Sequence, residues 1–246
     1  MRPGLLRRGL LVVGCGVMAV SLSACESTQR ESEKIGREAA RTSTGAASLK
    51  LGAPNRGVRV SQVTLLSAGG RKAVALRLTS TSARAQADVP VEVSVSGKGG
   101  KVLYSNATGE QESSLQHVAL LRPAQSVWWV DDQVLTSQPT TGVKVSIGTG
   151  QMPPAGALAQ LGTSGVQRSE QGGIAEVSGN LVNHSHSAQS KVAVFVVSLS
   201  GGRVRAAGRA VVAALAGQPG ASAPFQAFLV GKPAGSIQLS PVPSAG

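Results

Sequence analysis

The sequence predicts an all-β fold, with two tandem antiparallel β-sandwiches that follow a signal peptide and a flexible tether. Three observations lead to this prediction. Valine recurs at every second position in several segments, as in residues 89–95, and a period of two in β-branched residues is typical of half-buried strands. Glycine and proline separate these segments at short intervals. The order of strands and turns in the first half also recurs in the second half.

The first residues have the pattern of an export signal. Three arginines lie among the first eight residues, and residues 10–22 carry no charge. This stretch is too short to span a bilayer as a helix but suits the apolar part of a signal peptide. The segment 22–25, Leu-Ser-Ala-Cys, follows and resembles the lipobox of bacterial lipoproteins. The resemblance implies cleavage after residue 24 and attachment of diacylglyceryl to Cys25.

Lipidation would place the mature protein outside the cytoplasm, held by its acyl chains, palmitate among them, to a bacterial membrane. Which membrane and which leaflet stay open, as does the export route, since Arg7-Arg8 also loosely resembles a twin-arginine signal. An uncleaved transmembrane anchor is the other interpretation of this segment. Cleavage would remove Cys15, so the mature chain would contain one cysteine and no disulfide.

We predict five parts along the chain: signal peptide 1–24, lipidated cysteine and flexible tether 25–55, first sandwich 56–150, linker with a possible first strand 151–171, and second sandwich 172–246. The expected strands of the first sandwich are 58–65, 74–78, 89–96, 101–105, 114–121, 126–135 and 143–147. Those of the second are 174–183, 191–200, 203–206, 209–215, 223–230 and 236–239.

The second half reads Gly-Asn-Leu-Val-Asn-His-Ser at 179–185, an alternating strand at 192–199, Gly201-Gly202, Leu215, Pro219-Gly220 and Phe225. This order resembles the FxLYD-type, immunoglobulin-like β-sandwich repeats of bacterial lipoproteins, and residues 56–148 resemble them more weakly. The name-giving positions differ, because Val197–Gly201 keeps the leucine but lacks the phenylalanine, tyrosine and aspartate. The resemblance implies a fold and a location at the cell envelope, and it implies no enzymatic activity.

Few residues suggest chemistry. His184 and His186 could face the same way on a strand and bind a metal, but we interpret them as turn residues. Asp131 and Asp132 would point to opposite faces of a strand, so we interpret them as solvated edge residues. The glycine-rich segment 97–101 lacks the spacing of a phosphate-binding loop and is expected to be a hairpin turn. We therefore predict no catalytic, cofactor-binding or metal-binding residue.

Trp128 and Trp129 are the most distinctive local feature. One ring should point into the core and the other outward, where it would be covered by the other sandwich or would contact a partner. The formal net charge of +12 is spread along the chain, and aromatic residues make up 2%. Too few rings are present for a nucleic-acid stacking platform, so we expect no nucleic-acid partner. Anionic lipid, cell-wall polymer and an unidentified envelope protein stay open as partners.

These observations favour a non-enzymatic binding or assembly module at the cell envelope, anchored through lipid. A transport-associated lipoprotein that captures a small ligand is the alternative. Against that alternative, the sequence shows neither α/β alternation nor a charged, aromatic-lined cleft.

Overall fold

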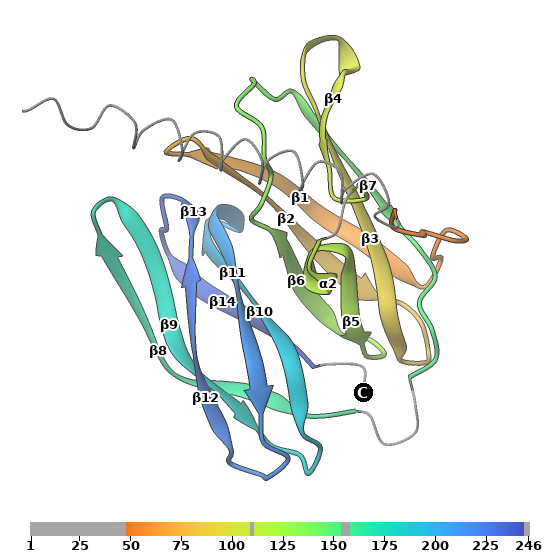
Figure 1. The fold of residues 1–246 in the computed structure, drawn as a ribbon, viewed down its shortest axis with the longest axis vertical. Helices are drawn as coiled ribbons and strands as arrows, with labels where there is room; N and C mark the ends of the chain where they lie inside the picture. The colour runs from red at the N-terminus through yellow and green to blue at the C-terminus, as the bar shows by residue number, and fades with distance from the viewer. Residues whose placement is uncertain (1–47, 109–110, 154–157, 244–246) are drawn as a thin grey trace, which may run out of the picture. The chain divides into compact units, whose positions relative to one another are not determined.

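The structure is a computed structural model that describes residues 48–108, 111–153 and 158–243 (Figure 1). The strands are β1 (Val58–Ala68), β2 (Arg71–Ser80), β3 (Gln86–Ser96), β4 (Val102–Ser105), β5 (His117–Leu121), β6 (Ser126–Asp131), β7 (Gly142–Ile147), β8 (Leu161–Gln171), β9 (Ile174–Asn183), β10 (Gln189–Ser200), β11 (Arg203–Leu215), β12 (Ser222–Phe228), β13 (Val230–Gly231) and β14 (Ser236–Val242). The helical segments of these residues are the 3-10 turn η2 (Lys98–Gly100) and the short helix α2 (Ser113–Gln116). The prediction of an all-β, antiparallel fold is confirmed.

The two halves of the described chain use the same strand order. In the first repeat, β1 to β7, one sheet has the order β1-β2-β6, and in the other β3 pairs with β4, β5 and β7. In the second repeat, β8 to β14, the corresponding sheets are β12-β9-β8 and β13-β11-β10-β14. The single strand β11 pairs along the whole of β10, whereas β4 and β5 each pair with one part of β3.

The same turn chemistry opens each repeat. Gly69 and Gly70 join β1 to β2, and Gly172 and Gly173 join β8 to β9. All four have positive φ, between 56° and 76°. Two-residue hairpin turns that match strand twist require positive φ at both positions, and glycine adopts it without the steric cost of a side chain. The glycine pairs therefore set the hairpin register of both repeats.

Several strands are buried on both faces, not on one as their alternation suggested. Residues 73–76 of β2 are all fully buried, and so is every residue from Val192 to Ser198 of β10. Side chains of a strand point alternately to opposite faces, so both faces of these strands must be covered. On β3 the half-buried pattern is confirmed for residues 91–96, where buried valines alternate with partly exposed residues.

The second cover comes from the other repeat. Strand β6 contacts β10, β11 and β14, and β2 contacts β11 and β13, so the β1-β2-β6 sheet packs against the β13-β11-β10-β14 sheet (Figure 1). We call the whole boundary between the two repeats, which includes this contact and that of β5 with β14, the seam. The apolar core of the first repeat continues across it to Phe195, Val197 and Ala207, while a separate core fills the second repeat. The described residues fall within one compact unit, Ala46–Gly246.

The described residues also shift two of the predicted boundaries. The expected tether ends earlier than residue 55, because the Leu49 N–H donates to the Ala107 carbonyl at 3.0 Å. The Asn55 Nδ2 donates to Gln86 Oε1 at 2.7 Å. Strand β8 fills the second half of the predicted linker 151–171, where a possible first strand was expected. The residues before β1 are held by hydrogen bonds to distant parts of the chain, which local composition does not encode. Strand β8 is held by its hairpin with β9.

Candidate functional site

Both tryptophans lie at the seam and are buried, Trp128 at 3% exposure and Trp129 at 0%. The Trp128 indole Nε1 donates to Gln238 Oε1 at 2.8 Å, and its backbone N–H donates to Ser240 Oγ at 2.9 Å. The Trp129 ring centroid lies 6.5 Å from that of Phe195. The expectation of one solvent-facing ring is wrong, because the second repeat covers the outer face of β6. Of the two interpretations, cover by the other sandwich is the one found, and neither ring is free to contact a partner.

An arginine of the second repeat binds acidic and hydroxyl groups of the first. Arg209 on β11 has a side chain that is only 5% exposed. Its Nη1 lies 2.5 Å from Glu112 Oε2 and donates to Ser114 Oγ at 2.7 Å, while its Nε lies 3.5 Å from Asp132 Oδ1. Burial raises the pKa of Asp132, and the charge of Arg209 opposes that rise. This ion-pair cluster ties the two repeats together at the seam.

Asp131 is also buried, so the interpretation of this aspartate pair as solvated edge residues is wrong. Its Oδ2 accepts a hydrogen bond from the Tyr104 hydroxyl at 2.6 Å, and its Oδ1 accepts one from the Gln133 N–H at 3.0 Å. Burial raises the pKa of Asp131 to about 6, although both hydrogen bonds act to lower it. The two neighbouring carboxylates bind different partners, Tyr104 of the same repeat and Arg209 of the other, and do not converge on one site.

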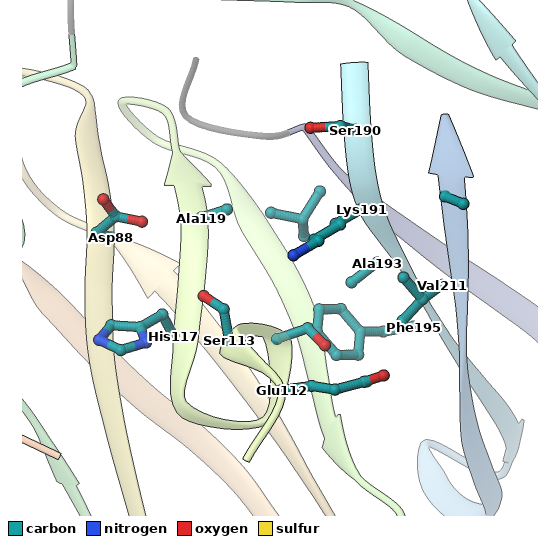
Figure 2. A pocket seen from close by; sticks show the side chains of 13 residues that line it. Asp88, Glu112, Ser113, His117, Ala119, Ser190, Lys191, Ala193, Phe195 and Val211 are labelled. Atoms are coloured by element: carbon teal, nitrogen blue, oxygen red, sulfur yellow. The ribbon is translucent and has the colours of Figure 1, made fainter. Parts of the chain in front are cut away.

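Beside this cluster the seam opens into a pocket of about 450 Å³ (Figure 2). Its lining comes from both repeats: Asp88, Glu112, Ser113, Ser114, His117, Ala119, Ser190, Lys191, Ala193, Phe195, Val211, Ala213 and Val242. Buried apolar side chains, Ala193, Phe195 and Val242, form the floor. The remaining residues are mostly polar and stand around it. Figure 2 shows Lys191 and Phe195 entering from β10, with Asp88 and His117 on the side of the first repeat.

Two charged residues of this pocket occupy equivalent places in the two repeats. Asp88 on β3 lies between the positions that pair with Leu120 and Val118 of β5. Lys191 on β10 lies between the positions that pair with Ala214 and Val212 of β11. Both have left-handed backbones, with φ of 47° and 50°, which non-glycine residues rarely adopt. Both are exposed, and neither forms a salt bridge or side-chain hydrogen bond within the described residues. The pocket therefore holds one unpaired carboxylate and one unpaired ammonium.

His117 separates this pocket from a neighbouring, more polar one of about 550 Å³. Asp88, Ser113 and His117 line both. Burial lowers the pKa of His117, and the nearby Asp88 charge partly opposes this. The imidazole is therefore neutral at neutral pH. Since Glu112 is paired with Arg209, the charged pocket residues without an ion-pair partner among the described residues are Asp88 and Lys191.

The other predicted positions lie elsewhere. His184 and His186 are in the turn between β9 and β10, and the described part of the chain has no group of three or more His, Cys, Asp or Glu able to hold a metal ion. Segment 97–101 is the turn between β3 and β4, as expected, with the Gly97 N–H donating to the Lys101 carbonyl at 2.9 Å. Cys25 and the predicted signal peptide, residues 1–24, lie outside the described residues. Within them, no helix is long and apolar enough to cross a membrane.

Sequence reasoning missed the residues that matter most at the seam, Asp88, Lys191 and Arg209. A signal for the first two was present. In both repeats a glutamine, a small residue and a charged residue directly precede the valine-rich strand, as Gln-Ala-Asp-Val at 86–89 and Gln-Ser-Lys-Val at 189–192. Arg209 carries no such signal, because its acidic partners lie in the other repeat.

Comparison of the sequence with protein-family models and with curated proteins gave no match.

Proposed function

We propose that this protein is a bacterial lipoprotein, anchored outside the cytoplasm through acyl chains on Cys25, that acts as a non-enzymatic binding module of the cell envelope. The anchoring half of the proposal is supported by the Leu-Ser-Ala-Cys sequence at 22–25 behind a basic, then apolar, start. Two acyl chains hold a protein at a membrane stably, whereas one does so only marginally.

The binding half is supported by one observation, the seam pocket. A volume of about 450 Å³ lies within the range of small-molecule sites, roughly 300–1,000 Å³. An apolar floor with a few polar groups around it is the usual composition of such sites. This observation favours the capture of a small ligand, which the sequence alone ranked as the alternative, over assembly with an envelope protein through the tryptophan pair.

The anchoring half is tested by expressing the precursor in a bacterial host with an alkyne analogue of palmitate. The wild-type chain should be labelled and should sediment with membranes. Cys25→Ser should abolish the label and leave the precursor uncleaved. Cys15→Ser is the matched control, because it removes the other cysteine of the chain and should leave labelling unchanged. Undiminished labelling of Cys25→Ser would refute the lipoprotein assignment.

A further inference from the structure

We propose that the seam pocket binds a small zwitterion that carries an apolar side chain, a molecule of about dipeptide size. Asp88 receives its ammonium group, Lys191 receives its carboxylate, and the apolar side chain lies on the Phe195 floor. This inference rests on the binding half of the proposed function and does not depend on lipidation.

The charges of the pocket support a ligand with both signs. Glu112 is already paired with Arg209, so it offers little to a ligand. Asp88 and Lys191 remain, one from each repeat, and no ion pair joins them to each other or to any other described residue. A ligand with a single charge would satisfy one of these groups and be repelled by the other. A zwitterion satisfies both, and charge-assisted hydrogen bonds are the stronger kind.

The floor supports an apolar side chain between the two charged ends. Phe195 and Val242 are buried at 1% and 2% exposure, whereas Val211 on the wall is 40% exposed. An exposed valine next to a buried phenylalanine offers apolar surface that a ligand would remove from water, at roughly 25 cal/mol per Å². The pocket volume lies near the lower end of the range for small-molecule sites, which fits a dipeptide better than a longer chain.

The backbone supplies an independent reason to treat these two positions as functional. Left-handed φ at a residue with a β-carbon stores strain, and such residues gather at ligand sites where the surrounding structure holds them. Four non-glycine residues of the described chain have left-handed φ, Gln62, Asp88, Ala124 and Lys191. Two of them, Asp88 and Lys191, occupy the equivalent position of each repeat and line the same pocket. Each strand continues past its strained residue in the same register. The conformation changes the direction of the side chain without shifting the pairing.

The test is calorimetric titration of the mature chain, residues 25–246 with Cys25→Ser, by the dipeptide Ala-Leu at millimolar concentration. Three analogues each lack one of the features that the pocket is proposed to recognise. N-acetyl-Ala-Leu lacks the ammonium group, Ala-Leu amide lacks the carboxylate, and Gly-Gly lacks the apolar side chain. Each should bind about tenfold more weakly than Ala-Leu, the scale of a lost hydrogen bond to a charged group or of a lost apolar contact. This protein carries no lipid, so the result is separate from the labelling test of anchoring.

Variants of the two charged pocket residues show which residue recognises which end of the dipeptide. In Lys191→Gln, Ala-Leu and its amide should bind equally, and in Asp88→Asn, Ala-Leu and its acetylated form should bind equally. Lys144→Gln and Glu170→Gln are the matched controls, since both residues are exposed and outside the pocket. All four positions are exposed, so the fold should be retained, which circular dichroism checks.

Occlusion provides a second, charge-independent test. Ala213→Trp should fill the pocket and abolish binding, because Ala213 is an exposed residue that lines it. Ala214→Trp, at the exposed neighbour that does not line the pocket, should bind as the wild type does. Absence of Ala-Leu binding to the wild type would overturn the proposal. So would binding that neither Lys191→Gln nor Asp88→Asn changes, or that survives Ala213→Trp.

Discussion

Burial of the Asp131 carboxylate should make the protein less stable at neutral pH than at mildly acidic pH. The pKa of Asp131 is raised from 3.8 to about 6 in the folded chain, mainly by burial. The folded state therefore binds a proton more readily than the unfolded state between about pH 4 and pH 6. The contribution of Asp131 to the free energy of unfolding should fall as the pH rises through this window and stay constant above it. At 1.36 kcal/mol per pKa unit, the loss attributable to Asp131 is about 3 kcal/mol.

The substitution Asp131→Asn removes this titration. Its Oδ1 can accept the Gln133 N–H, and its Nδ2 can donate to the Tyr104 hydroxyl, which can donate to Gln111 Oε1 instead. The variant should be more stable than the wild type at pH 7.5, by up to about 3 kcal/mol, and the difference should disappear near pH 4. Urea unfolding followed by tryptophan fluorescence measures this, because both tryptophans are buried. Glu176→Gln on β9 is the matched control for the loss of one carboxylate elsewhere in the chain. A variant less stable than the wild type at pH 7.5 would refute the reasoning, since the charged carboxylate would then be a net stabiliser.

Two further predictions concern the seam. Arg209→Met should lower the free energy of unfolding by about 3–5 kcal/mol, because it leaves the largely buried Asp132 carboxylate without its partner. Adding Asp132→Asn should restore part of this stability, and a double variant as unstable as Arg209→Met would contradict this explanation. Trp128→Ala and Trp129→Ala should each cost about 3–5 kcal/mol in urea unfolding, because both rings are buried. A cost below about 1 kcal/mol at Trp128 would mean that the second repeat does not cover this strand in solution.

The strands could be located from the sequence because their signals are local. The alternating valines of residues 89–95 and the glycine pairs at 69–70 and 172–173 act within a few residues of themselves. Two boundaries were wrong where a local hydrogen bond, and not the apolar periodicity, set the end of the strand. The predicted strand 114–121 begins instead as the helix α2, and the predicted strand 126–135 ends at Asp131. There the side chain of Asp131 accepts the Gln133 N–H and turns the chain.

The fold class, most strand positions and the internal repeat could be predicted, because each depends on periodicity and turn chemistry local to the chain. The prediction was wrong in dividing β11 into two strands, 203–206 and 209–215, and in joining β12 and β13 into one strand, 223–230. The cover on both faces of the β1-β2-β6 sheet, the burial of Trp128 and the contact of Arg209 with Asp132 depend on the packing of the two repeats. A period-two pattern says which residues share a face but not what covers that face. The pocket could not be predicted from the sequence for the same reason. Asp88 and Lys191 belong to different repeats and line one pocket only because the two repeats pack together.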